Sequence, residues 1–169
     1  MKILIIGTPT SGAKKLMNGI SEQGYEFLDE PFLQADWLNS HKNFMNWYKD
    51  SDYDKFVVKI TTRQKPNMIK DYFLFISQFT SQFDKLILLD RINTNIKKNK
   101  KFDGFNINSH KNCLQKISEI MNTPIISSEK LFTDDAMEQF EVINKMGLDL
   151  DSFELQSFLQ PSNKNQELI

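Results

Sequence analysis

The chain has 169 residues, of which 40% are hydrophobic and 25% charged, and its net charge is −1. These fractions are typical of a soluble globular domain, and a charge near zero predicts no broad attraction to nucleic acid or to an anionic membrane. One cysteine excludes an intrachain disulfide, and one cysteine with two histidines leaves no His/Cys metal cluster. No apolar run has membrane-spanning length, so we expect one cytoplasmic domain over residues 1–160 and a polar tail over 161–169.

The amino-terminal segment predicts an anion-binding loop. Residues 2–6 are an apolar run rich in β-branched side chains, as in a strand buried on both faces. A turn bounded by Gly7 and Gly12 follows, and apolar side chains then recur at helical spacing until Gly24, which is expected to close the helix. A strand, a tight turn and a helix start direct backbone N–H groups at one place, where a phosphate or sulfate is stabilised.

The same segment departs from the P-loop pattern, G-x-x-x-x-G-K-[ST]. Gly7 and Gly12 have the required separation, but Ala13 stands in place of the lysine and Lys14 in place of the hydroxyl residue. No Ser or Thr directly follows the lysines to hold Mg²⁺. An ordinary tight turn between a strand and a helix is therefore the alternative interpretation.

Further strands and helices alternate along the chain. Apolar runs predict four more strands, at residues 25–28, 55–60, 85–89 and 124–127. Periodic segments predict short helices within 33–48, a helix over 69–83, and helices that open at Ser109, Thr133 and Asp151. This alternation indicates an α/β fold, a three-layer parallel sheet of about five strands with helices on both faces, similar to P-loop NTPases.

In such a sheet, ligands bind beyond the carboxyl ends of the strands. The residues at these ends combine cations, hydroxyls and a few carboxylates, which suits an anionic cosubstrate. Arg91 is suited to a phosphate, and an ion pair with Asp90 or a neighbouring acid is its alternative role. The set comprises residues 8–15, Asp29, Glu30, 61–63, Asp90, Arg91, Ser127 and Ser128.

Three other features are interpreted without a functional role. Cys113 is expected to be a small core residue. The lysines that follow Arg91 (Lys97, Lys98, Lys100 and Lys101) are expected to be a solvated face rather than a nucleic-acid patch. His41 and His110 have no visible partners in the sequence.

Three segments of the chain resemble the sulfotransferase family, which uses 3′-phosphoadenosine 5′-phosphosulfate (PAPS). In the first loop, Pro9, Ser11 and Gly12 match the family's 5′-phosphosulfate loop. Residues 29–32 are similar to a segment whose glutamate is the base in some members. Residues 86–91, with Asn99 eight positions after the arginine, resemble the 3′-phosphate site.

The resemblance implies a transfer of a sulfuryl group from PAPS, without a metal, to a hydroxyl or amine of a small molecule or glycan. It implies Glu30 as the base and Lys14 as the cation that stabilises the transferred group. Thr10 stands where the family usually has a Lys or Arg, Asn99 replaces a serine, and Thr61 replaces a histidine that some members use. The implied PAPS or PAP ligands are Thr10, Ser11, Gly12, Ala13, Lys14, Lys15, Arg91 and Asn99.

Two other functions remain open. A P-loop nucleotide or nucleoside monophosphate kinase would use Asp90, at the end of an apolar strand, to bind Mg²⁺. Against it stands the absence of the Lys-[ST] pair after Gly12. A catalytically inactive nucleotide-binding module of the same fold is the third interpretation.

Overall fold

The computed structural model describes residues 1–30, 42, 44–46, 48, 49, 53–63, 72–92 and 106–160. Its strands form one parallel sheet in the order β2-β3-β1-β4-β5. The strands are β1 (Lys2–Gly7), β2 (Glu26–Asp29), β3 (Phe56–Thr61), β4 (Lys85–Asp90) and β5 (Ile125–Ser127). The helices are α1 (Ala13–Ser21), α3 (Tyr72–Thr80), α4 (Ile107–Met121), α5 (Ser128–Leu131), α6 (Ala136–Lys145) and α7 (Ser152–Leu159). The predicted α/β class is confirmed.

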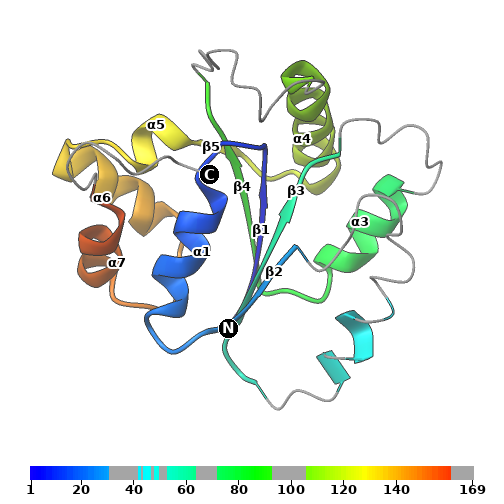
Figure 1. Cartoon of the computed structure of the whole chain (residues 1–169), viewed down its shortest axis with the longest axis horizontal. Helices are drawn as coiled ribbons and strands as arrows, with labels where there is room; N and C mark the ends of the chain where they lie inside the picture. The colour runs from blue at the N-terminus through cyan, green and yellow to red at the C-terminus, as the bar shows by residue number, and fades with distance from the viewer. Residues whose placement is uncertain are drawn as a thin grey trace.

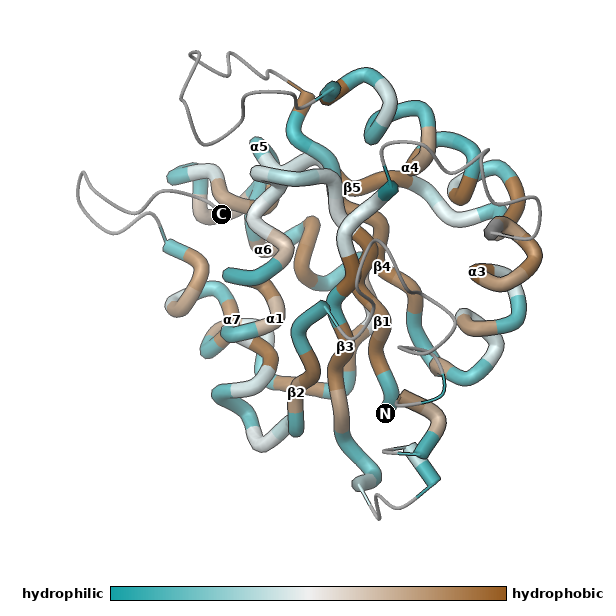
Figure 2. The backbone as a smooth tube through the Cα atoms, turned by 45° about the vertical axis from the view of Figure 1, so that its right-hand side comes forward, coloured by the Kyte–Doolittle hydropathy of each residue, from teal (hydrophilic) through white to brown (hydrophobic). Residues whose placement is uncertain are grey.

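The central strand β1 is buried on both faces, as its apolar run predicts. Successive side chains of a strand point to opposite faces, and Ile3 and Ile5 pack in one core with α1, α6 and α7. Leu4 and Ile6 pack in a second core with α3 and α4. Figure 2 shows hydrophobic residues along the central strands and on helices at both sides of the sheet. The sheet is therefore the middle of three layers.

The connections between strands place the loop after β1 at a switch in topology. From β1 the chain passes through α1 to β2 on one side of the sheet, whereas α3 carries it from β3 back past β1 to β4. Such crossovers are right-handed, so connections in opposite directions put their helices on opposite faces. Figure 1 shows α1 with α6 and α7 on one side and α3 with α4 on the other. Ligand sites of open α/β sheets lie at such a point.

Helix starts differ from the predicted ones by a few residues. Ser109 does not cap α4, because Asn106 does so by accepting a hydrogen bond from the Ser109 N–H at 3.2 Å. Asp135 rather than Thr133 caps α6. Asp151 caps α7 as predicted, accepting from two backbone N–H groups. Several short polar residues lie near the starts of both α4 and α6. The sequence pattern therefore does not decide which of them caps the helix.

Two aromatic residues between the second and third strands, Phe44 and Tyr48, pack in the core, whereas Tyr53 is exposed. Phe44 is buried, and its ring lies 4.8 Å from that of Phe79 in an edge-to-face arrangement. Cys113 is buried in the same core, as predicted. The tail 161–169, Asn99, the lysines of 97–101 and the whole segment 33–41 lie outside the described residues.

Candidate functional site

The loop between β1 and α1 is fixed at its base by both neighbouring strands. The Thr8 N–H donates to the carbonyl of Leu89 in β4 at 3.1 Å, and the Thr62 N–H donates to the carbonyl of Gly7 at 3.0 Å. At its far end, the hydroxyl of Ser128 donates to the carbonyl of Ser11 at 2.6 Å. The loop is thus held from β3, β4 and the start of α5.

The two glycines of the loop permit this tight path. A Cβ atom on Gly7 would lie 2.5 Å from the Ser11 Oγ and 2.8 Å from the Ala13 Cβ. Gly12 has a φ of +85°, and a Cβ there would lie 2.4 Å from a ring carbon of Phe132. Only glycine meets both demands at Gly12, because other residues rarely adopt this backbone region and bring a Cβ atom.

The start of α1 offers hydrogen-bond donors to a ligand. Its N-cap residue is Gly12, which has no side chain to cap the helix, and the first-turn N–H groups of a helix lack intrahelical acceptors and carry partial positive charge. Ser11 is only 1% exposed, and its Oγ has no hydrogen-bond partner among the described residues. The Oγ1 of Thr10, a residue with a φ of +66°, is also buried and without a partner there. This is the arrangement that binds an anion.

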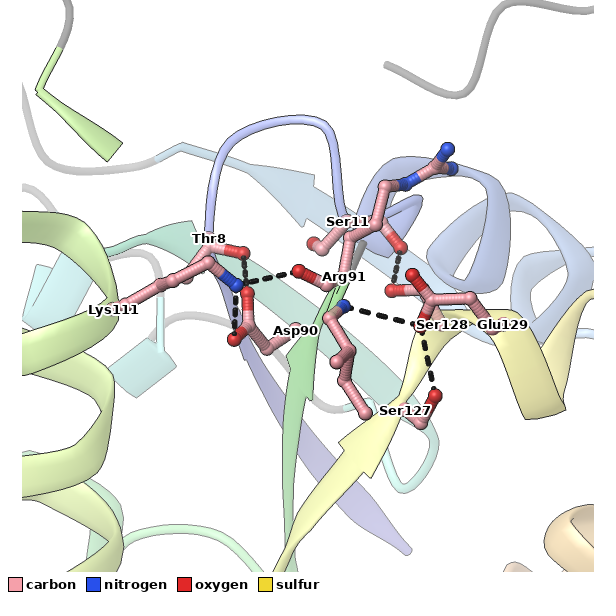
Figure 3. Close-up of polar contacts among 9 residues, drawn as sticks. Thr8, Ser11, Asp90, Arg91, Lys111, Ser127, Ser128 and Glu129 are labelled. Atoms are coloured by element: carbon pink, nitrogen blue, oxygen red, sulfur yellow. Dashed lines mark hydrogen bonds and ion pairs between the residues drawn. The ribbon is translucent and has the colours of Figure 1, made fainter. Parts of the chain in front are cut away.

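Arg91 adds a cation to the same side of the loop. Its Nε and Nη2 atoms are buried and have no hydrogen-bond partner among the described residues. Figure 3 shows its guanidinium on the side of Ser11, pointing away from Asp90 and Lys111. Among the described residues, Arg91 forms no ion pair with Asp90 or with another acid, which was its alternative role. A planar, permanently charged donor next to a helix start favours a phosphate or sulfate ligand.

Asp90 is instead engaged by two other residues. Its Oδ1 accepts a hydrogen bond from the Thr8 hydroxyl at 2.6 Å, and its Oδ2 lies 2.8 Å from the Lys111 ammonium. Lys111 also donates to the carbonyl of Arg91. Figure 3 shows this network at the base of the loop.

Glu30 belongs to a set of charged and hydroxyl residues at the ends of β2 and β3, the β2-edge cluster, defined as Lys14, Asp29, Glu30, Lys59 and Thr61. The ammonium of Lys59 lies 3.0 Å from the Asp29 Oδ1 and 2.9 Å from the Glu30 Oε1, which also accepts from the Thr61 hydroxyl. Lys14 lies 3.6 Å from the other oxygen of Asp29. Burial alone lowers the pKa of Lys59, but the two carboxylates outweigh it and the pKa is raised. Asp29 therefore brings the expected base and the expected cation to one edge of the sheet.

The side chain of Lys15 does not join the β2-edge cluster, because it lies near Gln160 and Phe132. Its ammonium lies 3.5 Å from the carbonyl of Gln160 and 5.8 Å from the ring centroid of Phe132, and burial lowers its pKa. Of the two lysines, Lys14 is the one that reaches the end of β2.

Some site residues have no local signal in the sequence. Lys111 is one lysine among many, and its contact with Asp90 spans 21 residues. Ser128 belongs to the set expected at the strand ends, but its contact with Ser11 spans 117 residues and has no local signal. Phe132 reads only as an apolar residue. Their roles follow from the sheet order, which brings β4 and β5 to the side of β1.

His110 has a partner, contrary to the expectation from the sequence. It is buried, and its Nδ1 lies 2.9 Å from the hydroxyl of Thr62, next to the loop base. Burial lowers its pKa, and a hydrogen bond with the backbone of Thr62 opposes this only in part.

The lowered pKa of His110 predicts a loss of stability in mild acid. Below the ordinary value of 6.5, the unfolded chain binds a proton at His110 that the folded chain does not. The free energy of unfolding therefore falls as the pH drops through 6.5 toward the folded pKa, by at most about 1.4 kcal/mol per pH unit. The variant H110N, which can keep a hydrogen bond to Thr62, should lack this term in urea unfolding between neutral and mildly acidic pH. If the free energy of unfolding depended on pH equally in both proteins, His110 would not be the group responsible.

The described part of the chain has neither a helix suited to crossing a membrane nor a group of three or more His, Cys, Asp or Glu side chains placed to hold a metal ion. Comparison of the chain with protein-family models, curated protein sequences and solved structures found no match.

Proposed function

We propose that the chain binds PAPS at the loop between β1 and α1 and transfers its sulfuryl group to a hydroxyl or amine of a small molecule or glycan. The observation that carries the proposal is a set of buried donors that have no partner among the described residues: the Ser11 hydroxyl just before α1 and two nitrogens of Arg91, which follows β4. A buried polar group without a partner destabilises a protein by about 1–3 kcal/mol. A bound anion would remove this penalty, so the site suits an anionic ligand.

The roles of the residues follow from their positions and from the resemblance to sulfotransferases. The first turn of α1, with Thr10, Ser11 and Gly12, would hold the 5′-phosphosulfate, and Arg91 would hold the 3′-phosphate. PAPS supplies the sulfuryl group and a good leaving group. The side chain of Lys14 is 52% exposed, so it can turn from Asp29 toward a ligand at the loop.

Glu30 would accept the proton of the acceptor group. Its Oε1 is held by Lys59 and Thr61, while no contact of its Oε2 is seen among the described residues. This arrangement fixes the orientation of the carboxylate and keeps one oxygen for the acceptor. A positioned general base contributes roughly 10²–10⁴-fold to a proton-transfer step.

The kinase alternative is less well supported by the contacts at Asp90. A Mg²⁺-binding aspartate needs an oxygen for the metal or for its water, but Thr8 and Lys111 engage both oxygens of this carboxylate. The pattern after Gly12 also lacks the Lys-[ST] pair that a kinase uses for Mg-ATP. The inactive-module alternative shares the binding site and differs only in turnover.

The proposal predicts that 3′-phosphoadenosine 5′-phosphate (PAP), the product nucleotide, stabilises the protein without a metal. A ligand at 100 times its Kd adds about 2.7 kcal/mol to the free energy of unfolding. Thermal unfolding with PAP in the presence of a chelator should show a clear rise in Tm. A rise only with Mg-ATP would exclude the sulfotransferase proposal in favour of a kinase.

Replacing Arg91 with alanine is expected to weaken PAP binding by roughly 10- to 100-fold, as for the loss of a charged hydrogen-bond donor. The ligand-free variant should be as stable as the natural protein or more so, since buried nitrogens without partners are removed. Calorimetric titration with PAP measures the first effect and thermal unfolding the second. An unchanged affinity would show that Arg91 does not contact the nucleotide.

A further inference from the structure

A single ammonium group lies among oxygen atoms at the base of the loop. The Nζ of Lys111 contacts the Asp90 Oδ2 at 2.8 Å and the carbonyl oxygen of Arg91 at 2.5 Å. The other oxygen of Asp90 accepts from the Thr8 hydroxyl. Carboxylate, carbonyl and hydroxyl oxygens are the ligands that hard divalent cations prefer. Here the ammonium of Lys111, a cation that is part of the chain, lies among these oxygens.

We infer that Lys111 acts as a built-in cation in place of a divalent metal, so that anion binding at the loop is independent of Mg²⁺. The inference rests on the proposed function, because it concerns the same anion site. Lys111 is a positioning residue in this view: it does not touch the anion but holds the groups that prepare the loop for it.

Two physical effects support this role. A bare carboxylate at Asp90 would repel an anion bound nearby, and an ammonium at 2.8 Å cancels that charge. The pair is also partly buried, with Lys111 25% and Asp90 15% exposed, so water screens it less than a surface pair. Because Asp90 in turn holds the Thr8 hydroxyl, the same ammonium fixes the first residue of the loop.

The position of Lys111 on a packed helix keeps its ammonium next to Asp90. It lies in the first turns of α4, whose start is fixed by the Asn106 cap, next to the buried His110. Figure 3 shows its side chain reaching from α4 toward Asp90, on the opposite side of the loop base from the Arg91 guanidinium. A lysine placed by a packed helix does not dissociate, whereas a metal ion does.

The variant K111M tests the inference, since methionine keeps the length of the side chain but not its charge. In a chelator, K111M should bind PAP about 10-fold more weakly than the natural protein, and millimolar Mg²⁺ should restore most of the loss. The natural protein and K111R should not respond to Mg²⁺. The double variant D90N/K111M, which removes both charges, should also show no response to Mg²⁺.

A second measurement needs no nucleotide. Electron paramagnetic resonance of Mn²⁺ should show binding to K111M, and neither to the natural protein nor to D90N/K111M. Metal-independent PAP binding by K111M at the natural affinity, or no Mn²⁺ binding by K111M, would overturn the inference. If the natural protein binds no PAP, the proposed function fails, but the Mn²⁺ result still decides the role of Lys111.

The variant D90N keeps the test open if K111M does not fold. It retains the ammonium and an oxygen that can accept from Thr8, so PAP should bind at least as tightly as to the natural protein, and without Mg²⁺. Binding by D90N that requires Mg²⁺ would overturn the inference.

Discussion

Replacing Gly12 with alanine is expected to lower the free energy of unfolding by about 2–4 kcal/mol and to abolish PAP binding. The φ of +85° at Gly12 is unfavourable for alanine, and the new Cβ would lie 2.4 Å from the Phe132 ring. The ring or the loop must therefore move. Because Gly12 directly precedes α1, a displaced loop also moves the N–H groups that would hold the anion. Urea unfolding and calorimetric titration with PAP measure the two effects.

Gly24 provides a matched control for this substitution. Its φ of +84° is nearly the same, but a Cβ there would have nothing within 4 Å. G24A should therefore show only the backbone penalty, about 1–2 kcal/mol, and should bind PAP normally. The double variant G12A/F132A, which provides room for the Cβ, should recover part of the binding. Equal destabilisation by G12A and G24A would show that the contact with Phe132 is unimportant.

Replacing Glu30 with glutamine is expected to reduce sulfuryl transfer by roughly 10²–10⁴-fold while leaving PAP binding nearly unchanged. Glutamine can still accept hydrogen bonds from Lys59 and Thr61, so the shape of the β2-edge cluster is largely kept. It cannot take a proton from the acceptor. Single-turnover transfer from labelled PAPS measures the chemical step, and titration with PAP measures binding.

Glu26 is the control carboxylate for this experiment. It lies at the other end of the same strand and is exposed, so E26Q should retain full transfer. Transfer by E30Q at the natural rate would remove Glu30 as the base. Loss of both transfer and PAP binding in E30Q would show instead that the β2-edge cluster shapes the nucleotide site.

The three central strands, β1, β3 and β4, could be predicted from the sequence because burial on both faces leaves a continuous apolar run. Each observed strand lies within one or two residues of a predicted apolar run, including β1, β3 and β4. The first residues of the helices were harder to predict than the strands. Asn106 caps α4 and Asp135 caps α6, where the sequence suggested Ser109 and Thr133. Short polar residues cap with similar strength, so tertiary packing decides among them.

The candidate site could be predicted only in outline. The carboxyl ends of the strands lie together at one edge of the sheet, as expected, because the strands pair in parallel. Which side chains pair there could not be predicted, because the partners of Asp90 and Ser11 come from α4 and α5. Lysine is abundant in this chain, so nothing distinguished Lys111 from a solvent-facing residue.

The central place of β1 also bears on how the chain is made. Ile3 pairs with Val57 on one side and with Lys85 on the other, so β1 has no complete set of neighbours until β4 has been synthesised. At about 5–20 residues per second, this delay is on the order of ten seconds. An apolar strand with both edges open is prone to associate with other chains. We therefore expect the nascent chain to depend on chaperones that protect β1 until β4 has been synthesised.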